Sequence, residues 1–308
     1  MRRAPLLAGL TIAAILPVNG RTDGCYMPPE SEWRKQRERS LILEPDQKAL
    51  IFFDRGREQL IISPNYAGQS SDFAWVVPVP ARPKVEILKG APFHELARLV
   101  EPPPMRKSTM AMGGRFAPPA ASVTVIERKT VGDYDVSVLS ATDSRALMNW
   151  LAENHYHLPP KAEAPMKAYV RDGWTFVASK IRLNDHASGL KTGTLTPLKL
   201  TFDTQHPMYP MRLTAASAQP FTLLLYIAEP NRPGLGPLEP MSQPLPRKDS
   251  LDGAYATQIL TPAMRASFPT LAKLSPAGLH VTWLRRNMRP EQCVRDYVWQ
   301  HRGEPIVR

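Results

Sequence analysis

Two histidines, His155 and His157, form the closest pair of metal-binding side chains in the sequence. On a strand, both rings would share one face and could bind zinc or copper, with a third ligand from His94, His186 or His206. They instead follow a segment with helical periodicity, and at a helix end residues two apart diverge. We therefore expect a solvated loop, with His155 and His157 as weak metal candidates, and we predict no metal and no other cofactor.

The carboxylates Asp133 and Asp135 flank Tyr134 and form a second candidate site. Alternate residues of a strand share a face, so this pair could perform acid–base chemistry, although a turn that enters a strand gives the same pattern. The sequence has no Gly-x-Ser-x-Gly motif, and its short glycine clusters lack the strand and helix that a phosphate-binding loop needs. We therefore predict no catalytic residues and keep an enzyme as the alternative.

Tryptophans are the candidate residues for binding a carbohydrate or a peptide. Trp75, Trp150, Trp174 and Trp283 could line a groove, but each falls within an apolar pattern that favours packing in the core. Trp75 and Trp174 remain the binding candidates.

The two cysteines, Cys25 and Cys293, lie near opposite ends of the chain. In an oxidising compartment they could form a disulfide, which the chain-entropy model values at roughly 4–5 kcal/mol for so long a loop. Cys25 could instead carry a lipid, although residues 22–24 lack the aliphatic residue of a lipidation motif, or both thiols could be unpaired. The sequence leaves all three alternatives open.

The periodicity of the chain predicts an α+β fold of mainly antiparallel sheets, with a few short helices and long Pro-rich loops. A hairpin is expected at 48–64, where Gly56 lies in the turn. Helical spacing at 91–102 and an N-cap at Asp143 predict two helices, and a further short helix is expected at about 163–171. The remaining strands are expected at 71–80, 122–130, 131–141, 173–183, 194–204, 211–218, 220–229 and 279–287.

Composition shifts divide the chain into four parts. Residues 1–20 are a predicted signal peptide, with cleavage possible as late as residue 24, and 25–229 are the main α+β domain. Residues 230–248 are a Pro-rich connector, and 249–308 are a C-terminal extension with a strand that packs back on the main domain. Within this extension, helix and loop are expected at 252–276.

The first residues indicate export. Arg2 and Arg3 precede about fourteen mostly apolar residues, as in a secretory signal peptide, and this run is too short for a membrane span of about twenty apolar residues. We therefore expect a periplasmic or extracellular protein, with no transmembrane span in the mature chain. Its formal charge of 39 − 28 = +11 becomes 37 − 28 = +9 without Arg2 and Arg3. The basic residues are scattered and form no nucleic-acid motif, so nucleic acid is not an expected partner.

A set of phrases in fixed order resembles one bacterial family. The phrases are ALIFFD, LIISPNYAG, DFAWVVPVP, VTVIERKTVGDYDVSVLSA, ALMNWLAENHY, YVRDGWTFVASKI and PMYPMRLTA, followed near the end by HVTWLRRNMRPEQCVRDYVW. Together they resemble the family catalogued as domain of unknown function 2330, over about 25–229 and 278–299. The resemblance implies an exported protein and implies no activity.

These observations predict an exported cell-envelope protein that acts as a non-enzymatic binding or structural module for an unknown envelope partner or ligand. The alternative is an envelope hydrolase or metal-dependent enzyme that uses Asp133 and Asp135 or His155 and His157. A third possibility is a role in adhesion or surface anchoring, which the positive charge permits.

Overall fold

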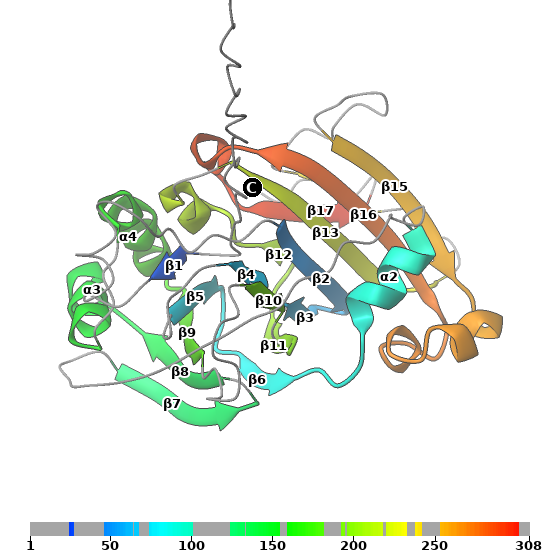
Figure 1. Cartoon of the computed structure of the whole chain (residues 1–308), viewed down its shortest axis with the longest axis horizontal. Coiled ribbons are helices and arrows are strands. Elements are labelled where there is room, and N and C mark those ends of the chain that lie inside the picture. Colours follow the sequence, from blue (N-terminus) through cyan, green and yellow to red (C-terminus); the bar gives the residue numbers. More distant parts are fainter. Residues whose placement is uncertain are drawn as a thin grey trace, which may run out of the picture.

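Two large β-sheets dominate the computed structural model of this chain (Figure 1). The predicted α+β fold, with mainly antiparallel sheets and few helices, is confirmed. The predicted Pro-rich loops lie largely outside the part that is described, which comprises residues 25–27, 46–63, 65–67, 74–100, 124–132, 134–154, 159–181, 192–194, 196–217, 220–232, 238–241 and 253–301.

The larger sheet has seven strands in the order β15-β16-β13-β2-β3-β11-β6. Neighbouring strands pair antiparallel, except that β2 and β13 run parallel. Its strands in chain order are β2 (Asp46–Asp54), β3 (Arg57–Ile62), β6 (Lys84–Ile87), β11 (Leu198–Asp203), β13 (Phe221–Pro230), β15 (Gly253–Leu260) and β16 (Leu279–Met288).

The second large sheet has five strands in the order β1-β5-β9-β8-β7, and all neighbouring strands pair antiparallel. They are β1 (Cys25–Met27), β5 (Ala74–Val79), β7 (Thr124–Val131), β8 (Tyr134–Ser140) and β9 (Thr175–Ile181). Two short sheets complete the strands: β4 (Asn65–Ala67) with β10 (Thr192–Thr194), and β12 (Met208–Tyr209) with β17 (Tyr297–His301) and β14 (Leu238–Pro240).

Helices cover the outer faces of both large sheets, so the molecule has four layers (Figure 1). The inner faces of the two sheets pack against each other and share one apolar core. The helices are α2 (Pro92–Val100), α3 (Ser144–Glu153) and α4 (Glu163–Arg171), with the 3₁₀ helices η1 (Pro160–Ala162), η2 (Arg212–Ala216), η3 (Pro262–Ser267), η4 (Leu271–Lys273) and η5 (Pro290–Gln292). Helices α3 and α4 cover the five-stranded sheet, and α2 with η3 and η4 covers the seven-stranded sheet.

Strand β5 is buried on both faces, because both of its alternating sets of side chains are apolar. Trp75 and Val77 belong to the core between the sheets, whereas Val76 packs under α3 and α4. The strand includes Pro78 and ends at Val79. Pro78 is tolerated because β1 pairs with β5 only as far as Val76. No strand on that side of Pro78 requires the backbone N–H that proline lacks.

Local sequence signals located several elements correctly. The hairpin of β2 and β3 and the helix α4 lie where the sequence analysis places them. Asp143 caps α3, since its Oδ2 accepts a hydrogen bond from the Ala146 amide at 2.9 Å.

Two predictions of local structure were wrong. The predicted strand at 211–218 is the 3₁₀ helix η2. Leu213 and Ala216 pack against the helix-covered face of the five-stranded sheet, and the Asp296 carboxylate accepts hydrogen bonds from the first amides of the turn. The predicted helix and loop at 252–276 begin with strand β15, whose eight residues all pair with β16. Contacts with residues distant in the sequence overrode a weak local pattern in both places.

The C-terminal segment is part of the fold and completes its layers. Strand β16 pairs with β13 along ten residues, and β14 pairs with β17 inside the stretch predicted as a connector. The buried Glu95 carboxylate of α2 accepts hydrogen bonds from the amides of Thr270 and Leu271 at 2.9–3.0 Å. These contacts attach η4 to α2 and close the outer layer over β13.

Candidate functional site

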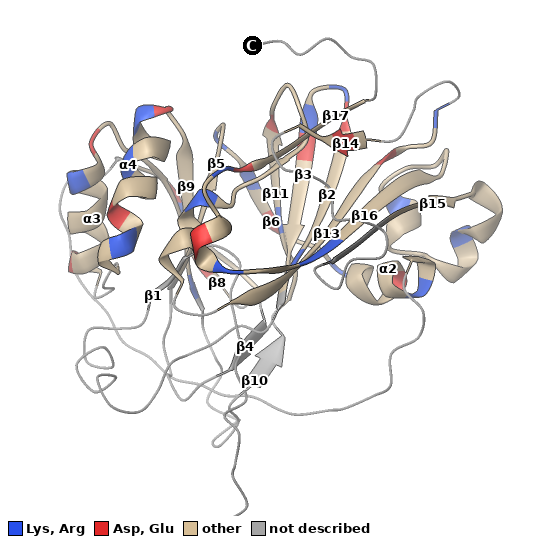
Figure 2. Cartoon of the chain, turned by 90° about the horizontal axis from the view of Figure 1, so that it is seen from above, with Lys and Arg blue, Asp and Glu red and all other residues tan. Residues whose placement is uncertain are grey.

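The tight turn between β2 and β3 places charged residues at one end of the seven-stranded sheet (Figure 2). Arg55 and Gly56 form this two-residue turn, with φ values of 51° and 77°. Two-residue hairpins require positive φ because their twist must match that of the strands, and glycine, asparagine and aspartate normally supply it. Arginine lacks that conformational freedom, so the backbone at Arg55 is strained.

Strand β11 supports this turn from the neighbouring position in the sheet. The Thr204 amide, immediately after β11, donates a hydrogen bond of 2.9 Å to the Gly56 carbonyl. Arg57 and Asp203 are opposite each other in the β3–β11 register. The strand ends therefore hold their side chains at defined positions around the turn.

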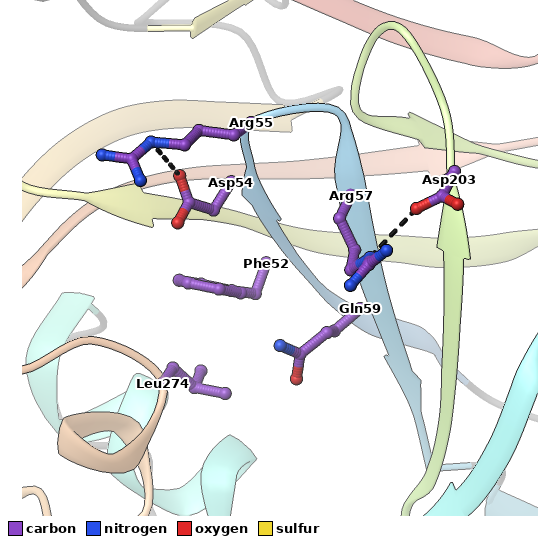
Figure 3. A pocket seen from close by; sticks show the side chains of 7 residues that line it. All are labelled: Phe52, Asp54, Arg55, Arg57, Gln59, Asp203 and Leu274. Carbon is purple, nitrogen blue, oxygen red and sulfur yellow. Dashed lines mark hydrogen bonds and ion pairs between the residues drawn. The ribbon is translucent and has the colours of Figure 1, made fainter.

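An open pocket of about 500 Å³ lies beside these strand ends (Figure 3). Phe52 of β2 and Leu274, which follows η4, supply apolar surface, and the Gln59 amide points into the same space. The other lining residues are charged: Asp54, Arg55, Arg57 and Asp203. The pocket therefore combines an apolar wall with a rim of guanidinium and carboxylate groups.

The rim charges are paired, but loosely. Arg57 Nε lies 2.9 Å from Asp203 Oδ1, and these side chains are 64% and 73% exposed. Arg55 Nε lies 4.0 Å from Asp54 Oδ1, and Asp54 also pairs with Arg232. Ion pairs this exposed contribute only about 0–1 kcal/mol, so an incoming ligand can replace them at little cost.

Glu58 lies between two pocket residues in β3 but faces the opposite side of the sheet. It is completely buried in the core between the sheets. Its Oε2 accepts a hydrogen bond from the Met208 amide at 2.8 Å, whereas its Oε1 has no partner. Burial raises the pKa of the Glu58 carboxyl well above its usual range, against the smaller opposing effect of the Met208 hydrogen bond.

The predicted carboxylate and histidine candidates do not enter the pocket. Asp135 lies on β8, where its Oδ1 accepts a hydrogen bond from Thr130 Oγ1 at 2.8 Å. Asp133, His155 and His157 fall outside the described residues, so their roles stay predictions. Within the ranges that are described, no three His, Cys, Asp or Glu side chains are grouped to hold a metal ion.

The cysteine pairing also stays a prediction. Cys293 is buried, and its Sγ lies 3.8 Å from the Arg289 carbonyl. Burial, with a smaller effect of the nearby Glu291 charge, raises the pKa of Cys293 to about 12. Cys25 begins β1 and pairs with Val76 in the backbone, and its side chain lies outside the described part of the chain.

The two tryptophan candidates have different surroundings. Trp75 is 2% exposed and lies in the core between the sheets, away from the pocket. Trp174 is half-buried, and its ring lies 4.6 Å from the Tyr169 ring. The Arg212 guanidinium lies over both rings, at 4.0 Å from Tyr169 and 5.5 Å from Trp174.

This aromatic pair is part of a polar network around Asp296. The Asp296 Oδ1 accepts hydrogen bonds from the Tyr169 hydroxyl at 2.5 Å and from the amides of Met211 and Arg212 at 2.8 and 3.1 Å. Arg212 Nε donates to Asp296 Oδ2 at 2.7 Å. Burial, followed by the Asp296 charge, raises the pKa of Tyr169 well above its usual range. The network joins α4, η2 and the residues before β17, and its groups satisfy one another, which indicates a structural role.

Sequence reasoning missed the pocket. Its residues look like a solvated charged turn, and Leu274 is more than two hundred residues from Phe52 in the chain. One local signal was present, since an Arg-Gly pair occupies a turn that normally takes Asn-Gly or Asp-Gly. The contribution of β11 and of the segment after η4 required the tertiary structure.

The fold and the pocket define a sheet-rich α+β protein with a small polar recess at the end of one sheet. The chain belongs to the bacterial family described as "Uncharacterized protein conserved in bacteria (DUF2330)", whose family model matches residues 36–235. Strands β15, β16 and β17 lie beyond the matched range and still complete the sheets.

Comparison with curated proteins and with solved structures identifies no related protein of known function. No curated protein matches the chain. A crystal structure of baculovirus P35 is similar at 10% sequence identity and a TM-score of 0.32, covering 72% of this chain and 76% of that one, a similarity too low to support any argument. No helix among the described residues has both the length and the apolar character to cross a membrane.

Proposed function

We propose that this protein is an exported binding module of the bacterial cell envelope, which takes a small zwitterionic ligand in the pocket beside the β2–β3 turn. The observation that carries the proposal is the composition of the pocket. It brings two guanidinium groups, two carboxylates and one amide together around apolar surface from Phe52 and Leu274.

The size and chemistry of the pocket set the ligand class. About 500 Å³ lies within the usual range for small-molecule sites of about 300–1,000 Å³ and is large enough for a dipeptide-sized molecule. Arg57 offers a planar fork for a carboxylate, and Asp203 offers an acceptor for an ammonium group. An apolar side chain on the ligand would contact Phe52 and Leu274. A short peptide with free termini carries all three features.

The proposed location depends on the N-terminal sequence. Arg2 and Arg3 followed by the apolar run support export. If export is followed by cleavage, mass spectrometry of protein secreted from a bacterial host will find Arg21 or Cys25 as the first residue. Full-length protein that retains Met1 in the cytosol would contradict the export proposal.

The binding proposal is tested with the dipeptide Gly-Leu as probe. We expect NMR shifts at the hairpin and a Kd below about 20 mM. Acetyl-Gly-Leu-amide, which lacks both charges, should bind at least about tenfold more weakly. Absence of shifts with Gly-Leu at about 20 mM, or shifts confined to another part of the molecule, would overturn the proposal.

A matched pair of variants tests the role of Arg57. Arg57→Gln removes a charged hydrogen bond to the ligand and should weaken Gly-Leu binding about tenfold or more. Arg82→Gln removes the same charge from a side chain of similar exposure, 62%, which is 3.9 Å from Glu127 on another surface. Equal loss of affinity in both variants would show that only overall charge matters.

The alternative of a hydrolase or metal-dependent enzyme rests on Asp133 and Asp135 or on His155 and His157. Asp135 is the member of this set that the structure describes, and it lies on a strand with Thr130 as its partner. This geometry does not favour the alternative over binding.

A further inference from the structure

Each large sheet has two edges, and three of the four edges are short or charged. Strand β1 has three residues and β6 has four, with Lys84 and Glu86 paired at 2.7 Å. Strand β7 is longer, but it carries Glu127, Arg128 and Lys129 and has an irregularity in its register between Val125 and Glu127. Short length, charge and bulges are the features by which natural proteins prevent an edge from pairing with another chain.

Strand β15 lacks these protective features. Its sequence, GAYATQIL, contains no charged residue and no proline over eight residues. All eight residues pair with β16, and among the described strands none pairs with the other side of β15. Figure 1 shows β15 as the outer border of the seven-stranded sheet.

The exposed apolar surface of the molecule points to the same edge. Among the described residues, Ile259 and Val294 are the large hydrophobic side chains that are exposed, at 47% and 68%. Ile259 lies in β15, whereas Val294 lies after η5. An exposed, uncharged edge with an exposed isoleucine is a template for strand addition.

We infer that two copies of this chain associate through β15, with the two strands antiparallel about a two-fold axis. A second copy fits because a two-fold contact requires a self-complementary surface. An uncharged strand meets this requirement, since antiparallel self-pairing places no like charges opposite each other. The two seven-stranded sheets would then form one continuous sheet of fourteen strands, which is within the range of large open sheets.

The net charge of the chain lets salt dependence distinguish a second copy at β15 from an acidic partner strand. Each full-length copy carries a formal charge of +11, so two copies repel each other at low ionic strength. Salt screens this repulsion, and self-association should therefore strengthen as salt rises. Binding of an acidic strand would weaken under the same change.

Sedimentation velocity of the full chain tests the inference. We expect a monomer–dimer equilibrium with a Kd of about 1–100 µM that tightens with added salt. Hydrogen exchange over β15 should slow as protein concentration rises, because the outer amides become paired. A monomer at all accessible concentrations, or a dimer without this protection of β15, would overturn the inference.

Three matched variants complete the test. Ile259→Lys places a charge on the proposed contact and should weaken dimerisation about tenfold or more, as should Gln258→Lys at a neighbouring exposed position. Val294→Lys adds the same charge at the other exposed hydrophobic residue and should leave the dimer intact. Thermal melts confirm that each variant is folded. Equal dimerisation in Ile259→Lys and Val294→Lys would contradict the role of β15.

Discussion

Replacement of Arg55 by asparagine should make the protein more stable. In the part of the chain that the structure describes, Arg55 is the non-glycine residue with positive φ, at 51°. Asparagine tolerates this left-handed conformation because its short side chain bonds locally, whereas other L-residues lose free energy there. The change therefore relieves backbone strain in the β2–β3 turn.

The expected magnitude comes from two opposing effects. The left-handed conformation costs an ordinary residue about 1–2 kcal/mol, of which asparagine recovers roughly half. The ion pair that is lost contributes almost nothing, because Arg55 is 82% exposed, its contact with Asp54 is 4.0 Å long, and Asp54 keeps Arg232 as a partner. The net gain is about 0.5–1 kcal/mol, or a rise in Tm of about 1–3 °C for a domain of this size.

Differential scanning calorimetry of wild type, Arg55→Asn and Arg82→Asn provides the test. The Arg82 variant loses the same charge at a position where φ is not positive, so its Tm should not rise. A Tm of Arg55→Asn at or below that of wild type would refute the strain argument. The Arg55→Asn variant should also bind Gly-Leu more weakly than wild type. That result would link the strained arginine to ligand binding in the pocket.

Three further predictions concern buried groups and the C-terminal segment. Because burial raises the pKa of Glu58, the folded state holds its proton more tightly than the unfolded state, and stability falls as pH rises above about 4.5. Denaturant titrations should therefore show Glu58→Gln more stable than wild type at pH 8, by about 1–3 kcal/mol, with the difference shrinking towards pH 4.5. Burial, with the nearby charge of His301, lowers the pKa of His280 although Glu229 Oε1 is 3.7 Å away, so the unfolded state takes up the proton first. Wild type should lose stability as pH falls below about 6.5, and His280→Gln should lose less; parallel pH profiles would contradict this. Finally, a fragment of residues 36–235 should fail to fold, as judged by circular dichroism and NMR dispersion, because it lacks β16 beside β13; a cooperative thermal transition in this fragment would count against the argument.

Local patterns located the elements that depend on neighbours in sequence. The turn glycine and flanking apolar runs indicated the hairpin of β2 and β3, and Asp143 indicated the start of α3. A strand was expected at 71–80, and β5 lies there with its two apolar faces in two different cores. These signals work because backbone geometry sets which side chains share a face.

The same reasoning failed where distant contacts decided the conformation. Residues 211–218 have a strand-like pattern, but Asp296 binds the first amides of η2 and favours a turn. Residues 253–260 form β15 because β16 offers a full-length partner. Neither partner can be identified from the local sequence.

By itself, the sequence determined the fold class, the family resemblance and most of the individual elements. It left the candidate site unassigned, because charged residues at strand ends are also typical of solvated turns. The tertiary structure decided which strand ends lie together, bringing Asp203 beside Arg57 and Leu274 across from Phe52. The physical reason is that periodicity encodes which face of an element is buried, whereas the identity of the element that covers it depends on packing across the whole chain.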